Sequence, residues 1–280
     1  MSPVGIVFIL LQIFLIIAHA LIVKVINNGD MTDNRYFLIQ ILSTTDIVYA
    51  ITNIPIVFIL NAGPITELDA GTKCLLILAN TAQQAGLYTT FLISLDRLVA
   101  VHRCLEYHLL VTRRRILFAL CGMLPPSVLT NTLLVFLTER KTRVLATYGI
   151  VILNFSWRLT TCIAILFTGS IALLLRKINL RLHDREPARL DMLTSLKRSI
   201  KDVAVLNFWT IVFFIPLLIT GTTEIFGKTE NARSTQIAIA FLQLANSLAN
   251  PFIYVFTQRE ICKRMERQLA CCVPRSIVDV

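Results

Sequence analysis

Long apolar stretches alternate with short polar ones along the chain, and the apolar stretches set its organisation. Seven of them are about 20 residues or longer, which lets a helix cross roughly 30 Å of hydrocarbon. They run over Pro3–Ile26, Tyr36–Leu60, Thr72–Val101, Arg115–Phe136, Ala146–Leu175, Ile200–Thr222 and Ser234–Thr257. Because helices satisfy their own backbone hydrogen bonds inside a membrane, the pattern predicts an all-α protein, a bundle of seven transmembrane helices.

Beyond the seventh stretch the pattern becomes amphipathic. Ile261, Met265 and Leu269 recur every four residues, with basic residues on the other faces. This spacing predicts a short helix that lies on the membrane surface. We therefore divide the chain into a seven-transmembrane domain, residues 1–257, and a cytosolic amphipathic helix with a short tail, residues 258–280.

Two adjacent cysteines, Cys271 and Cys272, follow this amphipathic segment. Thiols beside a membrane-surface helix are common sites of S-acylation, and simple free thiols are the alternative. We expect acylation, which would make the chain a lipoprotein.

Composition and charge agree with a membrane protein and indicate its orientation. Of 280 residues, 55% are hydrophobic and only 16% charged, which is too apolar for a soluble domain. Most Lys and Arg residues fall in one set of loops, including residues 113–115 and 176–201. The positive-inside rule then predicts a multi-pass plasma-membrane protein with an extracellular N-terminus and a cytosolic C-terminus. Its net charge of +10 suits anionic inner-leaflet lipid and requires no nucleic acid.

A few polar residues interrupt the apolar stretches. The pair Asp96-Arg97 ends the third stretch, and Asp46 lies near the middle of the second. A charge at this depth is costly unless it faces a partner or water. Asn246 and Asn250 are one turn apart in the seventh stretch, so their amides are expected at a depth close to Asp46.

Taken together and in order, these residues carry a resemblance. They include Asp46, the Asp96-Arg97-Leu98 element, Pro216 in the sixth stretch, and the element Asn250-Pro251-Phe252-Ile253-Tyr254. On seven spans this set resembles the rhodopsin-like, class A, G-protein-coupled receptors, from the first helix to the amphipathic tail. The chain departs from the family pattern at Leu98, where a Tyr is usual, at His19, which replaces a first-helix Asn, and at Phe214, which replaces a Trp.

The resemblance implies a mechanism and its residues. An agonist would favour a conformer in which the sixth helix swings about Pro216 and opens a cytosolic cleft for a heterotrimeric G protein. The coupling and switching residues would be Asp96, Arg97, Pro216, Asn250, Pro251 and Tyr254. Asp46, Asn246 and Asn250 are similar to the family's pocket for an allosteric sodium ion. No other cofactor or metal is expected.

The ligand is less closely indicated. Amine receptors carry an Asp about five turns before the third-helix Arg, and this chain has Ala79 there. The resemblance therefore implies a non-aminergic ligand: a neutral or anionic small molecule, a lipid or a peptide. The candidate ligand-binding residues are Ala79, Gln83, Arg158, Phe214, Gln236 and Gln243. A short second extracellular loop without a disulfide is similar to the melanocortin, lipid and adenosine branch.

Of the alternative functions, a transporter and an enzyme fit the sequence less well, and a chemosensory receptor fits it equally well. A chemosensory or odorant receptor of the same fold is equally compatible with the chain. A transporter would show two similar halves, and we find no such repeat. An enzyme would need clustered catalytic groups, but His19, His102, His108 and His183 are scattered, so we expect no catalytic residues. The expected partners are an extracellular ligand, a heterotrimeric G protein and membrane lipid, without nucleic acid.

Overall fold

The computed structural model describes residues 3–28, 33–62, 69–102, 107–139, 208, 212 and 232–272. Its helices are α1 (Pro3–Asn27), α2 (Asn34–Ala62), α3 (Ala70–His102), α4 (Tyr107–Leu110), α5 (Arg113–Glu139), α8 (Ala232–Thr257) and α9 (Arg259–Cys272). The described part of the chain is helical between its turns, which confirms the predicted all-α class. The predicted spans Ala146–Leu175 and Ile200–Thr222 lie outside the described residues, apart from Phe208 and Val212, which are helical.

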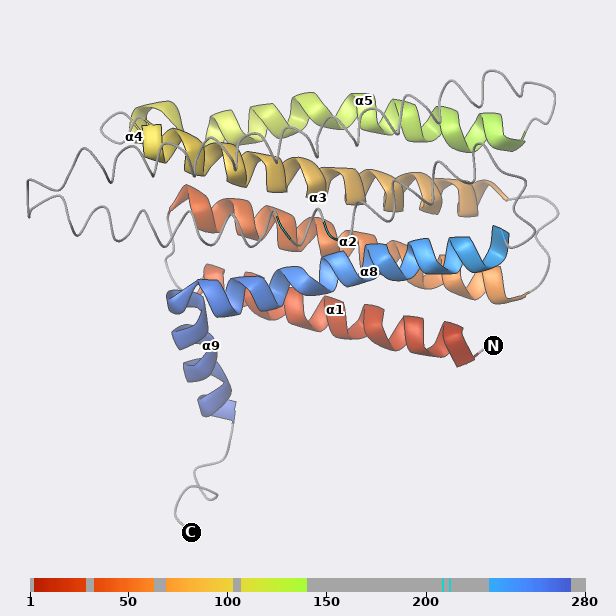
Figure 1. The fold of residues 1–280 in the computed structure, drawn as a ribbon, viewed down its shortest axis with the longest axis horizontal. Helices are drawn as coiled ribbons and strands as arrows, with labels where there is room; N and C mark the ends of the chain where they lie inside the picture. The colour runs from red at the N-terminus through yellow and green to blue at the C-terminus, as the bar shows by residue number, and fades with distance from the viewer. Residues whose placement is uncertain are drawn as a thin grey trace, which may run out of the picture.

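The long helices lie side by side in the bundle (Figure 1). Helix α2 packs against α1 and α3, α3 also packs against α5, and α8 lies next to α1. Helix α9 turns steeply away from the end of α8, where it contacts α1. Several residues far apart in sequence therefore meet where α1, α2 and α8 come together.

The outward faces of the helices are apolar, as expected in lipid. Within the described residues, Pro3–Asn27, Asn34–Ile59 and Arg113–Leu133 are long and apolar enough to cross a membrane by length and composition. Phe118 of α5 is 82% exposed, a position that costs free energy in water but not in hydrocarbon. Helices α3 and α8 carry more polar side chains, and several of these point into the bundle.

Helices α2, α5 and α8 each continue through prolines. Pro55 lies inside α2, Pro125 and Pro126 inside α5, and Pro251 inside α8. A proline has no N–H, so the carbonyl four residues earlier loses its helical partner. Groups on neighbouring helices can restore that hydrogen bond in a membrane bundle, and Pro251 provides an example.

Candidate functional site

A buried carboxylate on α2 forms the polar centre of the described bundle. The side chain of Ser247 donates a hydrogen bond to Asp46 Oδ1 at 2.7 Å, and Asn250 Nδ2 donates to Oδ2 at 2.9 Å. His19 Nε2 of α1 lies 3.4 Å from Oδ2. The carboxylate is therefore surrounded by donors from two other helices, which is the arrangement that makes a buried Asp tolerable.

Pro251 explains why His19 joins this centre. The Ser247 carbonyl has no N–H partner in its own helix, because residue 251 is proline. His19 Nε2 lies 3.1 Å from that carbonyl oxygen, and His19 is fully buried. A backbone carbonyl only accepts hydrogen bonds, so Nε2 carries the proton and donates. The imidazole thus connects α1 to the gap that the proline leaves in α8.

The structure brings together two of the three residues that the sequence analysis assigns to this centre. Asp46 and Asn250 are brought together, and in the described residues it is Ser247, rather than the predicted Asn246, that donates to Asp46. Both 246 and 247 are within one helical turn of 250, so it is the orientation of α8 about its axis that brings Ser247, and not Asn246, to Asp46. A neutral His19 that hydrogen-bonds to a neighbouring helix is the reading that the sequence favours, but the sequence did not place His19 at this centre.

A second polar site lies at the end of α3. Arg97 Nη2 contacts Asp96 Oδ2 at 2.5 Å, and Asp96 is buried while Arg97 is partly exposed. The hydroxyl of Tyr107 donates to Asp96 Oδ1 at 2.6 Å. Both carboxylate oxygens of Asp96 therefore have partners, one from its own helix and one from α4.

The short helix α4 positions Tyr107 for this contact. Val111 N donates to the Tyr107 carbonyl at 2.9 Å, and Asn34 Nδ2 of α2 donates to the Val111 carbonyl at 2.7 Å. Burial raises the pKa of Tyr107 well above its usual range, and the negative charge of Asp96 raises it further. Tyr107 thus stays protonated and acts as a donor. Sequence reasoning missed both this residue and α4.

The expected ligand-binding residues lie nearer the other end of the bundle. Gln243 Nε2 of α8 donates to Gln83 Oε1 of α3 at 3.2 Å, and Tyr49 of α2 donates to Gln243 Oε1 at 3.3 Å. Ala79 is buried in an apolar cluster with Tyr49 and Ile56. Tyr49 is a member that the sequence did not indicate. Arg158 and Phe214, and the side chain of Gln236, lie outside the described residues.

The remaining predicted switch residues are on α8 or outside the described chain. Pro251 lies inside α8, and Tyr254 is buried among apolar side chains that include Ile22 and Leu42. The Tyr254 hydroxyl has no hydrogen-bond partner among the described residues. Pro216 lies outside the described residues. Cys271 and Cys272 end α9, but their side chains are not among those described.

Comparison with known proteins identifies the family. The model of the 7 transmembrane receptor (rhodopsin family) matches residues 18–254, which is most of the chain. This match does not separate the branches of the family, so nearness to the melanocortin, lipid and adenosine receptors stays a prediction. No curated protein matches the chain. The matched region includes Asp46, Asp96-Arg97 and Asn250-Pro251, and the chain belongs to the seven-transmembrane receptors of the rhodopsin family.

Proposed function

We propose that this receptor binds an extracellular ligand within the helix bundle and activates a heterotrimeric G protein. The observation that carries the proposal is the Asp96-Arg97 pair, because a buried carboxylate holds a strong cation at the end of α3. The C-terminal end of α3, which carries Arg97, lies at the same end of the bundle as α9 and the basic start of α5 (Figure 1). We assign this end to the cytosol and the N-terminus to the extracellular side of the plasma membrane.

Activation would consist of releasing Arg97. In the resting arrangement Asp96 holds Arg97, and Tyr107 holds Asp96. A ligand shifts the balance between resting and active conformers only as far as its affinity for the two differs. In the active conformer Arg97 would leave Asp96 and contact the G protein, as opening of the cytosolic side allows.

The ligand site would include the amides that join α3 to α8. Gln83 and Gln243 present donors and acceptors without charge, and Tyr49 adds a hydroxyl. Ala79 provides no carboxylate for an amine. These groups favour a neutral polar ligand; anionic small molecules, lipids and peptides fit if Arg158 contributes. A chemosensory ligand is the second candidate, since small uncharged odorants need only such contacts.

Asp46 would also hold the allosteric sodium ion. Carboxylate, hydroxyl and amide oxygens are the ligands that hard cations prefer, and Asp46, Ser247 and Asn250 provide all three. Gly86 of α3, which packs beside Leu42, adds no oxygen. A bound cation would neutralise the Asp46 charge within the bundle.

The decisive experiment combines a ligand screen with Arg97→Ala. Ligands are screened by nucleotide exchange on several purified G proteins with the receptor in nanodiscs. Arg97→Ala should abolish exchange while surface expression persists, because the variant lacks the cation that would leave Asp96 and contact the G protein. Arg114→Ala, an exposed cation at the start of α5, is the matched control and should retain exchange. Unchanged nucleotide exchange in Arg97→Ala would show that Arg97 is not needed for G-protein coupling.

A further inference from the structure

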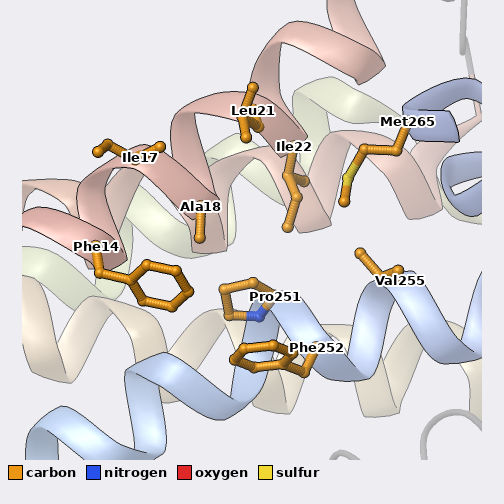
Figure 2. Close-up of a pocket in the computed structure, with 9 residues that line it drawn as sticks. All are labelled: Phe14, Ile17, Ala18, Leu21, Ile22, Pro251, Phe252, Val255 and Met265. Carbon is orange, nitrogen blue, oxygen red and sulfur yellow. The ribbon is translucent and has the colours of Figure 1, made fainter. Parts of the chain in front are cut away.

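An apolar groove on the outside of the bundle, between α1, α8 and α9, is one feature that the proposed function does not use. Figure 2 shows α1 on one side of this groove and Pro251 and Phe252 of α8 on the other, with Met265 reaching in from α9. Its volume is about 330 Å³, and all the side chains that line it are apolar. The groove therefore has no polar group that would select one ligand over another.

Three consecutive arginines, residues 113–115, begin α5, and their position is unfavourable for that helix. The first turn of a helix carries the positive end of its dipole, so cations there are destabilising. Arg113 lies over the ring of Phe37, with its guanidinium carbon 5.3 Å from the ring centroid. Arg114 is exposed and makes no hydrogen bond or ion pair with any of the described residues. Arg115 instead contacts the preceding helix, α4.

Arg115 reaches back to the C-terminal end of α4. Its Nη1 donates hydrogen bonds to the carbonyl oxygens of Leu110 at 2.9 Å and Leu109 at 3.1 Å. The last carbonyls of a helix have no partner within the helix and carry the negative end of its dipole, so a guanidinium is a favourable partner there. The same cation that is unfavourable at the start of α5 therefore stabilises the end of α4.

Helix α4 depends on such contacts because it is very short. It has only four residues, Tyr107–Leu110, and lies at the end of the bundle where α3 ends and α5 begins (Figure 1). A single turn fixes several backbone angles for one hydrogen bond, here from Val111 N to the Tyr107 carbonyl at 2.9 Å, so it does not persist on its own. Two side chains hold its C-terminal side: Arg115 of α5, and Asn34 of α2, which donates to the Val111 carbonyl.

We propose that Arg115 is a positioning residue that seats Tyr107 on Asp96 and so holds the receptor at rest, a role that rests on the function proposed above. Without Arg115 the end of α4 would lose its cap, and the turn would unwind in part of the molecules. The Tyr107 hydroxyl would then leave the Asp96 carboxylate. The resting conformer would lose a contact that the active conformer lacks, so the balance would shift toward release of Arg97.

Nuclear magnetic resonance of tyrosine labelled with ¹³C at Cζ reports the Tyr107 hydroxyl directly, without a G protein. The receptor in nanodiscs has six tyrosines, and the Tyr107 signal is the one that Tyr107→Phe removes. Because the Cζ shift depends on the hydrogen bond that the phenol donates, Arg115→Ala should move this signal toward that of a solvent-exposed tyrosine. Arg115→Gln keeps a donor without the charge and should move the signal part of the way, which keeps the test decisive if Arg115→Ala does not fold.

Arg114→Ala is the matched control. It removes the same charge from the same turn of α5, and Arg114 does not contact α4. The Tyr107 signal should therefore stay in place, which separates the contact with α4 from a general effect of charge on membrane topology. A Tyr107 signal that stays in place in both Arg115→Ala and Arg115→Gln would overturn the proposal.

Basal nucleotide exchange tests the effect on activity. Arg115→Ala should raise ligand-free exchange about fivefold at matched surface expression, less than loss of the Tyr107 hydroxyl would, because Asn34 still holds the Val111 carbonyl. In a Tyr107→Phe background Arg115→Ala should add no further rise, since both changes act through the same hydrogen bond. The same rise in that background would show that Arg115 acts by another route and would overturn the proposal.

A failure of the proposed function would look different. If no ligand drives exchange on any G protein in the wild type, coupling is refuted and the resting role with it, whereas the tyrosine signal still shows whether Arg115 seats Tyr107. If ligands drive exchange and the Tyr107 signal moves in Arg115→Ala, but basal exchange stays at the wild-type level, coupling stands and the proposal for Arg115 is wrong.

Discussion

The hydrogen bond from Tyr107 to Asp96 is the contact whose loss should be easiest to detect. Its 2.6 Å length lies within the range of hydrogen bonds to a charged carboxylate. Such bonds contribute about 1.5–3 kcal/mol. Tyr107 is only partly buried, so we take the lower figure. If the bond exists only in the resting conformer, its loss raises the ratio of active to resting receptor about tenfold.

Tyr107→Phe removes the hydroxyl and keeps the ring. Basal nucleotide exchange on the coupled G protein, measured without ligand at matched surface expression, should rise about tenfold. Tyr88→Phe is the control, because the buried Tyr88 hydroxyl accepts a hydrogen bond from Ser127 at 3.0 Å, away from the Asp96 pair. That control should lower stability without raising basal exchange.

A double mutant sharpens the test. If Tyr107 acts through Asp96, then Tyr107→Phe should add little to the effect of Asp96→Asn, because coupled residues are not additive. Two results would refute the reasoning: basal exchange at the wild-type level in Tyr107→Phe, or a full tenfold rise that persists in the Asp96→Asn background.

Three further perturbations follow from the described contacts. Asp69 accepts hydrogen bonds from Thr72 at the start of α3, which hold the pKa of Asp69 below its usual range. The stability that it adds is present above the ordinary aspartate pKa and is lost as pH falls through the lower folded-state value, so Asp69→Ala should lower the unfolding temperature at neutral pH but not in strong acid. Sodium chloride should raise the wild-type unfolding temperature above that in choline chloride, and Asp46→Asn should abolish the difference; no sodium effect in the wild type would count against the ion site. Tyr36 donates to Glu260 Oε2 at 2.5 Å, so Tyr36→Phe should speed hydrogen exchange in α9 by about tenfold, and unchanged exchange would show that other contacts hold α9.

The fold could be predicted because a membrane restricts the choices. Apolar runs of the right length identify spanning helices, and the basic residues of α9 distinguish it from them. The partners Asp46 and Asn250 could also be predicted, since a buried carboxylate needs donors at its own depth. Both inferences depend on properties that are local in the sequence or set by the bilayer.

The other site residues, Ser247 and Tyr107, could not be predicted from the spacing of residues in the sequence, because their contacts depend on how the helices pack. Ser247 and Asn246 are adjacent and both polar, and only the rotation of α8 about its axis decides which meets Asp46. Tyr107 reaches Asp96 because Asn34 fixes the loop after α4, a contact between residues 77 apart. The apolar groove between α1, α8 and α9 could not be predicted either, because the residues that line it are of the same types as those that pack in the core.

Pro251 changes which helix supplies the hydrogen bond to the Ser247 carbonyl of α8. At position 251 any other residue would supply an N–H, and the Ser247 carbonyl could complete the hydrogen-bond ladder of its own helix. His19 would then compete for that oxygen, and its ring would be left with Asp46 as its main acceptor. One hydrogen bond within α8 is instead replaced by one hydrogen bond between α8 and α1. The proline therefore fixes the position of the first membrane-spanning helix relative to the last.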